Sequence, residues 1–195
     1  MCSTCIQDPK VREDILMEPD RDRAVRYLRG GRLARSLQIQ SQDCRSGCSM
    51  LEVLMEDPYK LERFVAAQNA GGTYERAVGE LRRGRKTSHW MWFVFPQIAG
   101  LGHSQMSVTF AISSLEEAKA YLRHPVLGPR LLECAEVVAA ATAGSAEQIF
   151  GGIDAQKLHS CMTLFVRAEP GEPRFKQVLD KYFDGVPDAA TDARV

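Results

Sequence analysis

After residue 56, apolar residues recur at intervals of three and four, and glycine or proline separates each run from the next. Leu61, Phe64 and Val65 open the first run, which Gly71-Gly72 end. This spacing is typical of helices that bury one face against a shared core. It predicts an all-α fold, a single compact domain of about six to seven helices over residues 57–195. The later runs occupy residues 74–81, 115–123, 131–138, 158–165 and 175–182.

Local signals mark two of the helix starts. Ser113 or Ser114 forms a capping box with Glu116 or Glu117, which predicts a helix beginning at this point. Pro129 suits the first residue of the following helix, because the N–H that proline lacks has no helical partner there.

Only the segment 106–112 has the character of a strand. It contains the β-branched residues Val108, Thr109 and Ile112. Because no segment of similar character is available to pair with it, we expect at most a minor extended element in an otherwise helical domain.

Residues 1–56 differ from the rest of the chain. Tyr27 is their only aromatic residue, and Gly30-Gly31 interrupt the one segment that could be helical, residues 21–40. Without aromatic mass these residues cannot build a core of their own. We therefore expect an N-terminal extension that is partly disordered or loosely helical.

The cysteines divide into two groups. Cys134 and Cys161 fall in apolar helical patterns and are predicted to be buried thiols. The other four have spacings that can chelate zinc, but the long gap between their two pairs favours free thiols, so we expect no metal site. These four are Cys2, Cys5, Cys44 and Cys48.

Charge and hydropathy exclude several classes of protein. The 25 basic and 25 acidic residues give a formal net charge of zero, which disfavours a duplex nucleic acid as the partner. The apolar runs fall short of the ~20 residues of a membrane helix, and the N-terminus lacks the apolar segment of a secretory signal. We expect a cytoplasmic protein without a membrane partner. No phosphate-binding loop or dinucleotide fingerprint occurs, so we expect no bound cofactor.

Both tryptophans of the chain lie in one segment, residues 86–97 with the sequence KTSHWMWFVFPQ. Aromatic stripes of this kind usually belong to a core helix. However, the N–H groups of Trp90 and Trp92 need partners when buried. Ser88, His89 and Gln97 bring further polar atoms to the same neighbourhood, which is more typical of a binding site than of a dry core.

A basic run, Arg82-Arg83-Gly84-Arg85-Lys86, precedes these aromatics. Its cations could simply be solvated charges at the end of a helix, where they suit the helix dipole. Together with stacking aromatics, Arg85 and Lys86 could instead hold a phosphate-bearing ligand. Beyond the motif, the segment Gly100-Leu101-Gly102 with Ser104 could be a simple turn or could bring backbone N–H groups close to a ligand.

A second polar constellation lies along one edge of a later helix. Asp154, Lys157 and Ser160 follow helical spacing, and Thr163 comes one turn further on. Asp154 and Lys157 could form only an i,i+3 ion pair. They could also supply a carboxylate and an amine to a pocket shared with His89.

The tryptophan motif, together with the segments before and after it, resembles a bacterial family catalogued as domain of unknown function 1810. The resemblance extends over about residues 57–188 and implies a compact, mainly helical fold without an established activity. It rests on Lys86, the segments 88–97 and 100–102, Ser104, 111–113, 117–118, 121–122, 124–125, 128–131, Asp154, 157–158, Ser160, 162–165 and 182–183.

We expect a small-molecule pocket around the tryptophan motif, for a nucleotide-like or phosphate-bearing ligand. If a reaction occurs, His89 would be the acid or base, and Asp154 or Lys157 would orient it or the substrate. The alternative is an interaction module without chemistry, which would contact a protein or a single nucleic-acid strand through the basic run. The expected ligand-binding residues are Arg85, Lys86, Ser88, Trp90, Trp92, Gln97, Ser104, Ser160 and Thr163.

Overall fold

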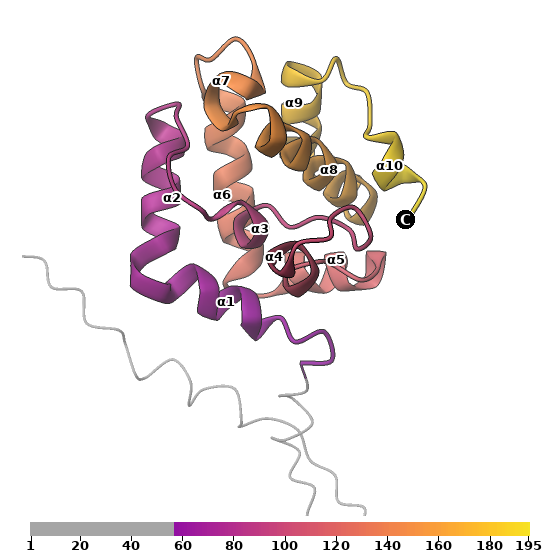
Figure 1. Ribbon diagram of the computed structural model, residues 1–195. Helices are drawn as coiled ribbons and strands as arrows, with labels where there is room; N and C mark the ends of the chain where they lie inside the picture. Colours follow the sequence, from indigo (N-terminus) through magenta and orange to yellow (C-terminus); the bar gives the residue numbers. More distant parts are fainter. Residues whose placement is uncertain (1–56) are drawn as a thin grey trace, which may run out of the picture. The chain divides into compact units, whose positions relative to one another are not determined.

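Helices α6 (Leu127–Ala140) and α8 (Gly152–Ala168) are the longest helices of a computed structural model that describes residues 57–195. Two further helices, α5 (Leu115–Arg123) and α9 (Pro173–Tyr182), each pack against both of them and join them (Figure 1). The apolar stripes predicted from the sequence face this shared interior, where the side chains are almost completely buried. These include Leu131, Cys134, Val138, Leu158, Phe165, Phe175 and Val178.

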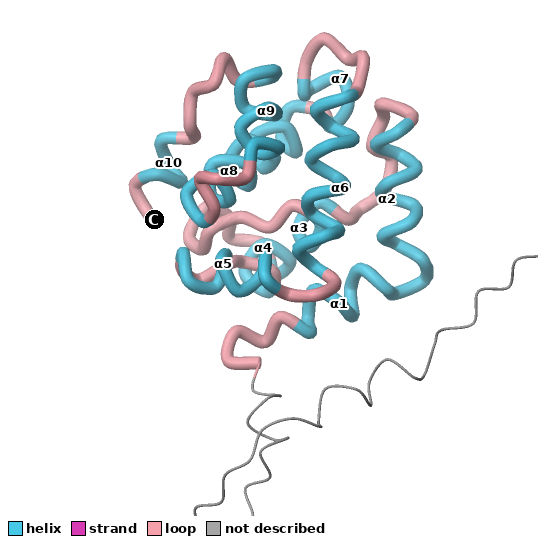
Figure 2. Tube along the Cα trace, turned by 180° about the vertical axis from the view of Figure 1, so that it is seen from behind, coloured by secondary structure: helices cyan, strands magenta, loops and turns pink. Residues whose placement is uncertain are grey.

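The first part of the domain is a pair of helices. Helix α1 (Glu62–Asn69) continues into a single 3-10 turn, Ala70–Gly72, and then into α2 (Thr73–Arg82), which lies alongside α6 (Figure 2). Gly71 and Gly72 turn the chain between them, with φ of 58° and 66°. This left-handed backbone is readily adopted by glycine, which explains why the first apolar run ends here.

The all-α prediction is confirmed for residues 57–195. Six of their helices have eight residues or more, and they coincide with the six apolar runs of the sequence. Four helices of only one turn or slightly more add to these, and the first of them lies in the tryptophan motif, for which a core helix was one interpretation. They are α3 (Met91–Val94), α4 (Gln105–Thr109), α7 (Ala146–Phe150) and α10 (Ala189–Asp192).

The predicted extended character of residues 106–112 is wrong for most of that segment, which belongs to α4. The hydroxyl of Ser104 accepts a 3.1 Å hydrogen bond from the Ser107 N–H and so caps the start of the helix. Only Ile112 is paired in β fashion, in an isolated parallel bridge with Ile98. Without a partner strand, β-branched residues follow the local cap rather than their own propensity.

The two predicted helix starts have different outcomes. The Ser114 hydroxyl accepts from the Glu117 N–H at 3.2 Å, as the capping box predicts. Helix α6, however, begins at Leu127 instead of Pro129. The reason is His124, whose Nδ1 accepts from the N–H groups of Val126 and Leu127 at 3.2 and 3.3 Å and thereby caps the helix earlier.

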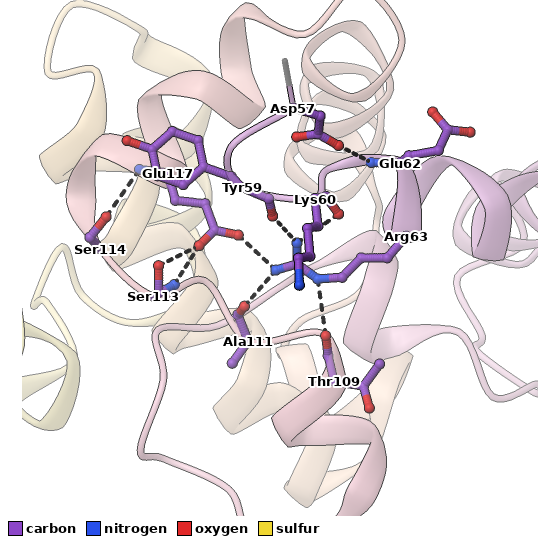
Figure 3. A network of polar contacts seen from close by, with 10 residues as sticks. All are labelled: Asp57, Tyr59, Lys60, Glu62, Arg63, Thr109, Ala111, Ser113, Ser114 and Glu117. Carbon is purple, nitrogen blue, oxygen red and sulfur yellow. Dashed lines mark hydrogen bonds and ion pairs between the residues drawn. The ribbon is translucent and has the colours of Figure 1, made fainter. Parts of the chain in front are cut away.

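Arg63 fastens α1 to the segment between α4 and α5 (Figure 3). Its guanidinium donates to the carbonyl oxygens of Thr109 and Ala111 at 3.0 and 2.9 Å, and to Glu117 Oε1 at 2.7 Å. Glu117 also accepts from the N–H and hydroxyl of Ser113 at 2.8 and 2.6 Å. This network fixes the chain between residues 109 and 117, directly after α4, relative to α1.

The predicted extension, including the zinc alternative for its cysteines, lies outside the described residues. Within residues 57–195 no group of three His, Cys, Asp or Glu side chains could hold a metal ion. None of the helices described is long and apolar enough to cross a membrane. Cys134 and Cys161 are buried thiols, as predicted, and burial raises the pKa of Cys134 to about 12.

Candidate functional site

The carboxylate of Glu80, on α2, organises the start of the tryptophan motif. Its Oε2 accepts from the indole N–H of Trp90 at 2.8 Å and from the backbone N–H groups of Thr87 and Ser88 at 2.8 and 3.1 Å. Its Oε1 accepts from the Ser88 hydroxyl at 2.7 Å. Burial alone would raise the pKa of Glu80, but the hydrogen bonds from Ser88, Thr87 and Trp90 lower it to about 2. The Ser88 hydroxyl and the Trp90 indole N–H, which were predicted to bind a ligand, therefore donate to Glu80 instead.

Beside Trp90, two lysines share one carboxylate. Lys86 Nζ lies 2.7 Å from Asp154 Oδ2, and Lys157 Nζ lies 2.7 Å from Asp154 Oδ1. Each ammonium also lies over an indole: Lys86 is 5.1 Å from the centre of the Trp90 ring, and Lys157 is 4.5 Å from that of Trp92. We call Lys86, Asp154 and Lys157 the charge cluster.

The charge cluster is mostly removed from water and is not neutral. Its three side chains are only 9%, 18% and 18% exposed. Burial would raise the pKa of Asp154, but the hydrogen bonds from Lys157 and Lys86 lower it below its ordinary value. With the carboxylate ionised, two ammonium groups and one carboxylate leave one positive charge that no acidic partner within ion-pair distance balances among the described residues.

A cleft of about 620 Å³ opens beside Lys157. One wall is the loop between α3 and α4, the floor is the first half of α8, and the other wall is the segment that leads into α10. The lining residues predicted from the sequence as site residues are Trp92, Gln97, Ser104, Lys157 and Ser160. The cleft is also lined by Leu101, Gly102, His103, Ser107, Ile153, Gln156, His159, Asp188 and Ala190.

The remaining predicted residues lie elsewhere. His89 and Arg85 are exposed to solvent, and neither lines the cleft. This cleft is therefore not the pocket that His89 and Lys157 were predicted to share. Arg82, in the same basic run, pairs with Glu133 at 3.0 Å.

The hydroxyls of Ser160 and Thr163 anchor the C-terminal segment to α8. Ser160 Oγ lies 2.8 Å from Thr191 Oγ1, and Thr163 Oγ1 accepts from the backbone N–H of Asp188 at 2.9 Å. Asp188 in turn caps α10 by accepting from the N–H and hydroxyl of Thr191 at 2.9 and 2.6 Å. Both predicted binding residues thus hold the segment that forms one wall of the cleft. Ser160 also lines the cleft, whereas Thr163 does not.

His159 is a cleft residue to which the sequence assigned no role. Its Nε2 lies 2.7 Å from the carbonyl oxygen of Val186, and its ring stacks on Phe183 with centres 4.1 Å apart and planes 2° apart. The hydrogen-bonded partner is 27 residues away in the chain, so spacing within the sequence gave no signal of this arrangement.

Fold and site together define an all-α domain with a cationic edge to an open cleft. The chain matches the family described as "Protein of unknown function (DUF1810)" over residues 58–195, and it belongs to that family. It is similar to the conserved hypothetical protein Rv1873 from Mycobacterium tuberculosis, whose crystal structure superposes with a TM-score of 0.68. The two are 52% identical, and the match covers 70% of this chain and 96% of that one. A comparison with curated proteins finds no match.

Proposed function

We propose that the cleft binds a small anionic molecule, of the phosphate-bearing class, through Lys157. The observation that carries this proposal is the imbalance of the charge cluster, in which Lys86 and Lys157 share the single carboxylate of Asp154. A partly buried pair of positive charges that one shared carboxylate balances only in part is costly, and an anion beside Lys157 would offset that cost. Lys157 is the member of the cluster that lines the cleft.

Trp92 supports the same ligand chemistry. Unlike the indole N–H of Trp90, that of Trp92 makes no hydrogen bond within residues 57–195, and no buried side-chain nitrogen or oxygen among them lacks a partner. The N–H of Trp92 is therefore accessible to solvent beside the cleft. It can donate to an oxygen of an anion that the neighbouring Lys157 attracts.

A thermal-shift experiment tests this proposal with inorganic phosphate, sugar phosphates and nucleotides. A compound that binds the folded state raises the melting temperature of the wild type by mass action. The Lys157→Met variant is expected to lose this response. Lys176→Met is the matched control, since Lys176 is exposed and also pairs with an acidic residue on its own helix, Asp180, at 2.6 Å. The proposal fails if no compound stabilises the wild type, or if Lys157→Met responds as the wild type does.

A further inference from the structure

The imidazole of His159 is held in one tautomer. A carbonyl oxygen accepts hydrogen bonds and cannot donate them, so the 2.7 Å contact with Val186 requires the proton on Nε2. In the neutral ring, Nδ1 then carries a lone pair. The parallel stack on Phe183 covers one face of the ring and holds its orientation.

Nδ1 of His159 is available to a ligand. It makes no hydrogen bond to any residue between 57 and 195, whereas every buried side-chain nitrogen and oxygen in that range has a partner. Nδ1 is therefore accessible to solvent, on a side chain that lines the cleft. The ring offers an acceptor of fixed direction, which needs no rearrangement to receive a hydrogen bond.

Lys157 and His159 stand at opposite edges of the cleft floor. An α-helix turns by about 100° per residue, so the two positions lie about 160° apart across the side of α8 that lines the cleft. Ile153, Gln156 and Ser160, which also line the cleft, lie between them on the same face. A molecule that spans the floor therefore meets a cation at one end and a hydrogen-bond acceptor at the other.

We propose that His159 is a second recognition residue, whose Nδ1 accepts a hydrogen bond from a hydroxyl group of the bound molecule. The ligand class is then a phosphate ester of a polyhydroxylated molecule, such as a sugar phosphate. This inference rests on the proposed function, because Lys157 fixes the anionic end. It goes beyond that function by stating what the other end of the molecule must carry.

A matched pair of compounds isolates the hydroxyl groups. Ribose 5-phosphate and tetrahydrofurfuryl phosphate share the phosphate and the five-membered ring, but only the first carries ring hydroxyls. Because a net hydrogen bond changes affinity by roughly two- to tenfold, the wild type should bind ribose 5-phosphate about fivefold more tightly in calorimetric titration. His159→Phe keeps an aromatic ring on Phe183 and should abolish that preference while leaving the affinity for inorganic phosphate unchanged. His89→Phe, away from the cleft, should keep the preference.

The outcomes separate the two proposals. If phosphate binds through Lys157 but the wild type shows no preference, or His159→Phe keeps it, the role of His159 is wrong and the anion site stands. If neither phosphate nor either ester binds the wild type, both proposals fail. Because His159→Phe removes the bond to Val186 and could disturb the fold, ring ¹⁵N NMR of the wild type is a second measurement. A proton on Nδ1 in the free neutral ring would overturn the inference.

Discussion

The indole N–H of Trp90 donates a 2.8 Å hydrogen bond to Oε2 of Glu80. This contact separates the roles of the two tryptophans. Trp90 is completely buried and closed off by its own protein partner, whereas Trp92 lines the cleft with its N–H unengaged among the described residues. The same aromatic segment thus supplies the core with one indole and the candidate site with the other.

Removal of the Glu80 carboxylate should destabilise the domain severely. In Glu80→Ala, the indole N–H of Trp90 and the backbone N–H groups of Thr87 and Ser88 lose their acceptor. The bond from Trp90 is buried and the other two are partly buried, and an unsatisfied buried group costs ~1–3 kcal/mol, so we expect a loss of about 2 kcal/mol. Glu80→Gln keeps an acceptor oxygen and should lose clearly less. Urea denaturation measures both, and equal losses would contradict this account of Glu80.

The same residue predicts how stability depends on pH. The pKa of Glu80 is about 2 in the folded state, below its ordinary value of 4.5, so the unfolded chain takes up the proton first. The contribution of Glu80 is therefore complete above pH 4.5 and is lost as the pH falls towards 2. In urea titrations at about pH 6 and about pH 3, the wild type should lose more stability than Glu80→Gln does. Identical losses would show that Glu80 does not titrate in this way.

Substitutions in the charge cluster should be strongly coupled. Asp154→Asn leaves Lys86 and Lys157 without their carboxylate, and we expect it to cost about 2 kcal/mol because the cluster is mostly buried. Adding Lys86→Met should recover part of this loss, since it removes one of the two positive charges. Asp180→Asn, in the exposed pair with Lys176, serves as the control and should change stability by less than about 1 kcal/mol. Additive losses in the double mutant would argue against a shared carboxylate.

The helical domain should fold without the N-terminal extension. The helices described begin at Glu62 or later, so a chain that starts at Met55 should melt within a few degrees of the full-length protein. Calorimetry of both chains, with and without a chelator, checks this expectation. A drop of many degrees on truncation would contradict it. A drop caused by the chelator in the full-length protein alone would instead support a zinc site at Cys2, Cys5, Cys44 and Cys48.

The six longer helices could be predicted because each carries enough apolar residues to show its period. Helix α3 spans only Met91–Val94, about one turn of the longer core helix that was one interpretation of the tryptophan motif. The role of Glu80 was not predicted. In the sequence, a glutamate next to an apolar stripe is expected to face solvent. Glu80 is buried because residues 87–90 fold back over it, and the sequence does not indicate this contact.

The candidate site was predicted in part. Trp92, Gln97 and Lys157 do line one cleft. The pairing of Asp154 with Lys157 could be foreseen, since both lie on one helix at i,i+3 spacing. The second contact of Asp154, with Lys86, and the orientation of His159 by Val186 could not be foreseen, because both depend on how distant segments pack.

The central claim, that an anion binds beside Lys157, can be tested most directly by NMR titration with inorganic phosphate. The chain contains two tryptophans, so its spectrum has two indole N–H signals that Trp92→Phe assigns. Phosphate should shift the signal of Trp92, which lies against Lys157 in the cleft, and should leave that of Trp90 in place because Glu80 accepts its hydrogen bond. In Lys157→Met neither signal should move. A wild-type Trp92 signal that stays fixed at saturating phosphate, or moves equally in Lys157→Met, would contradict the claim.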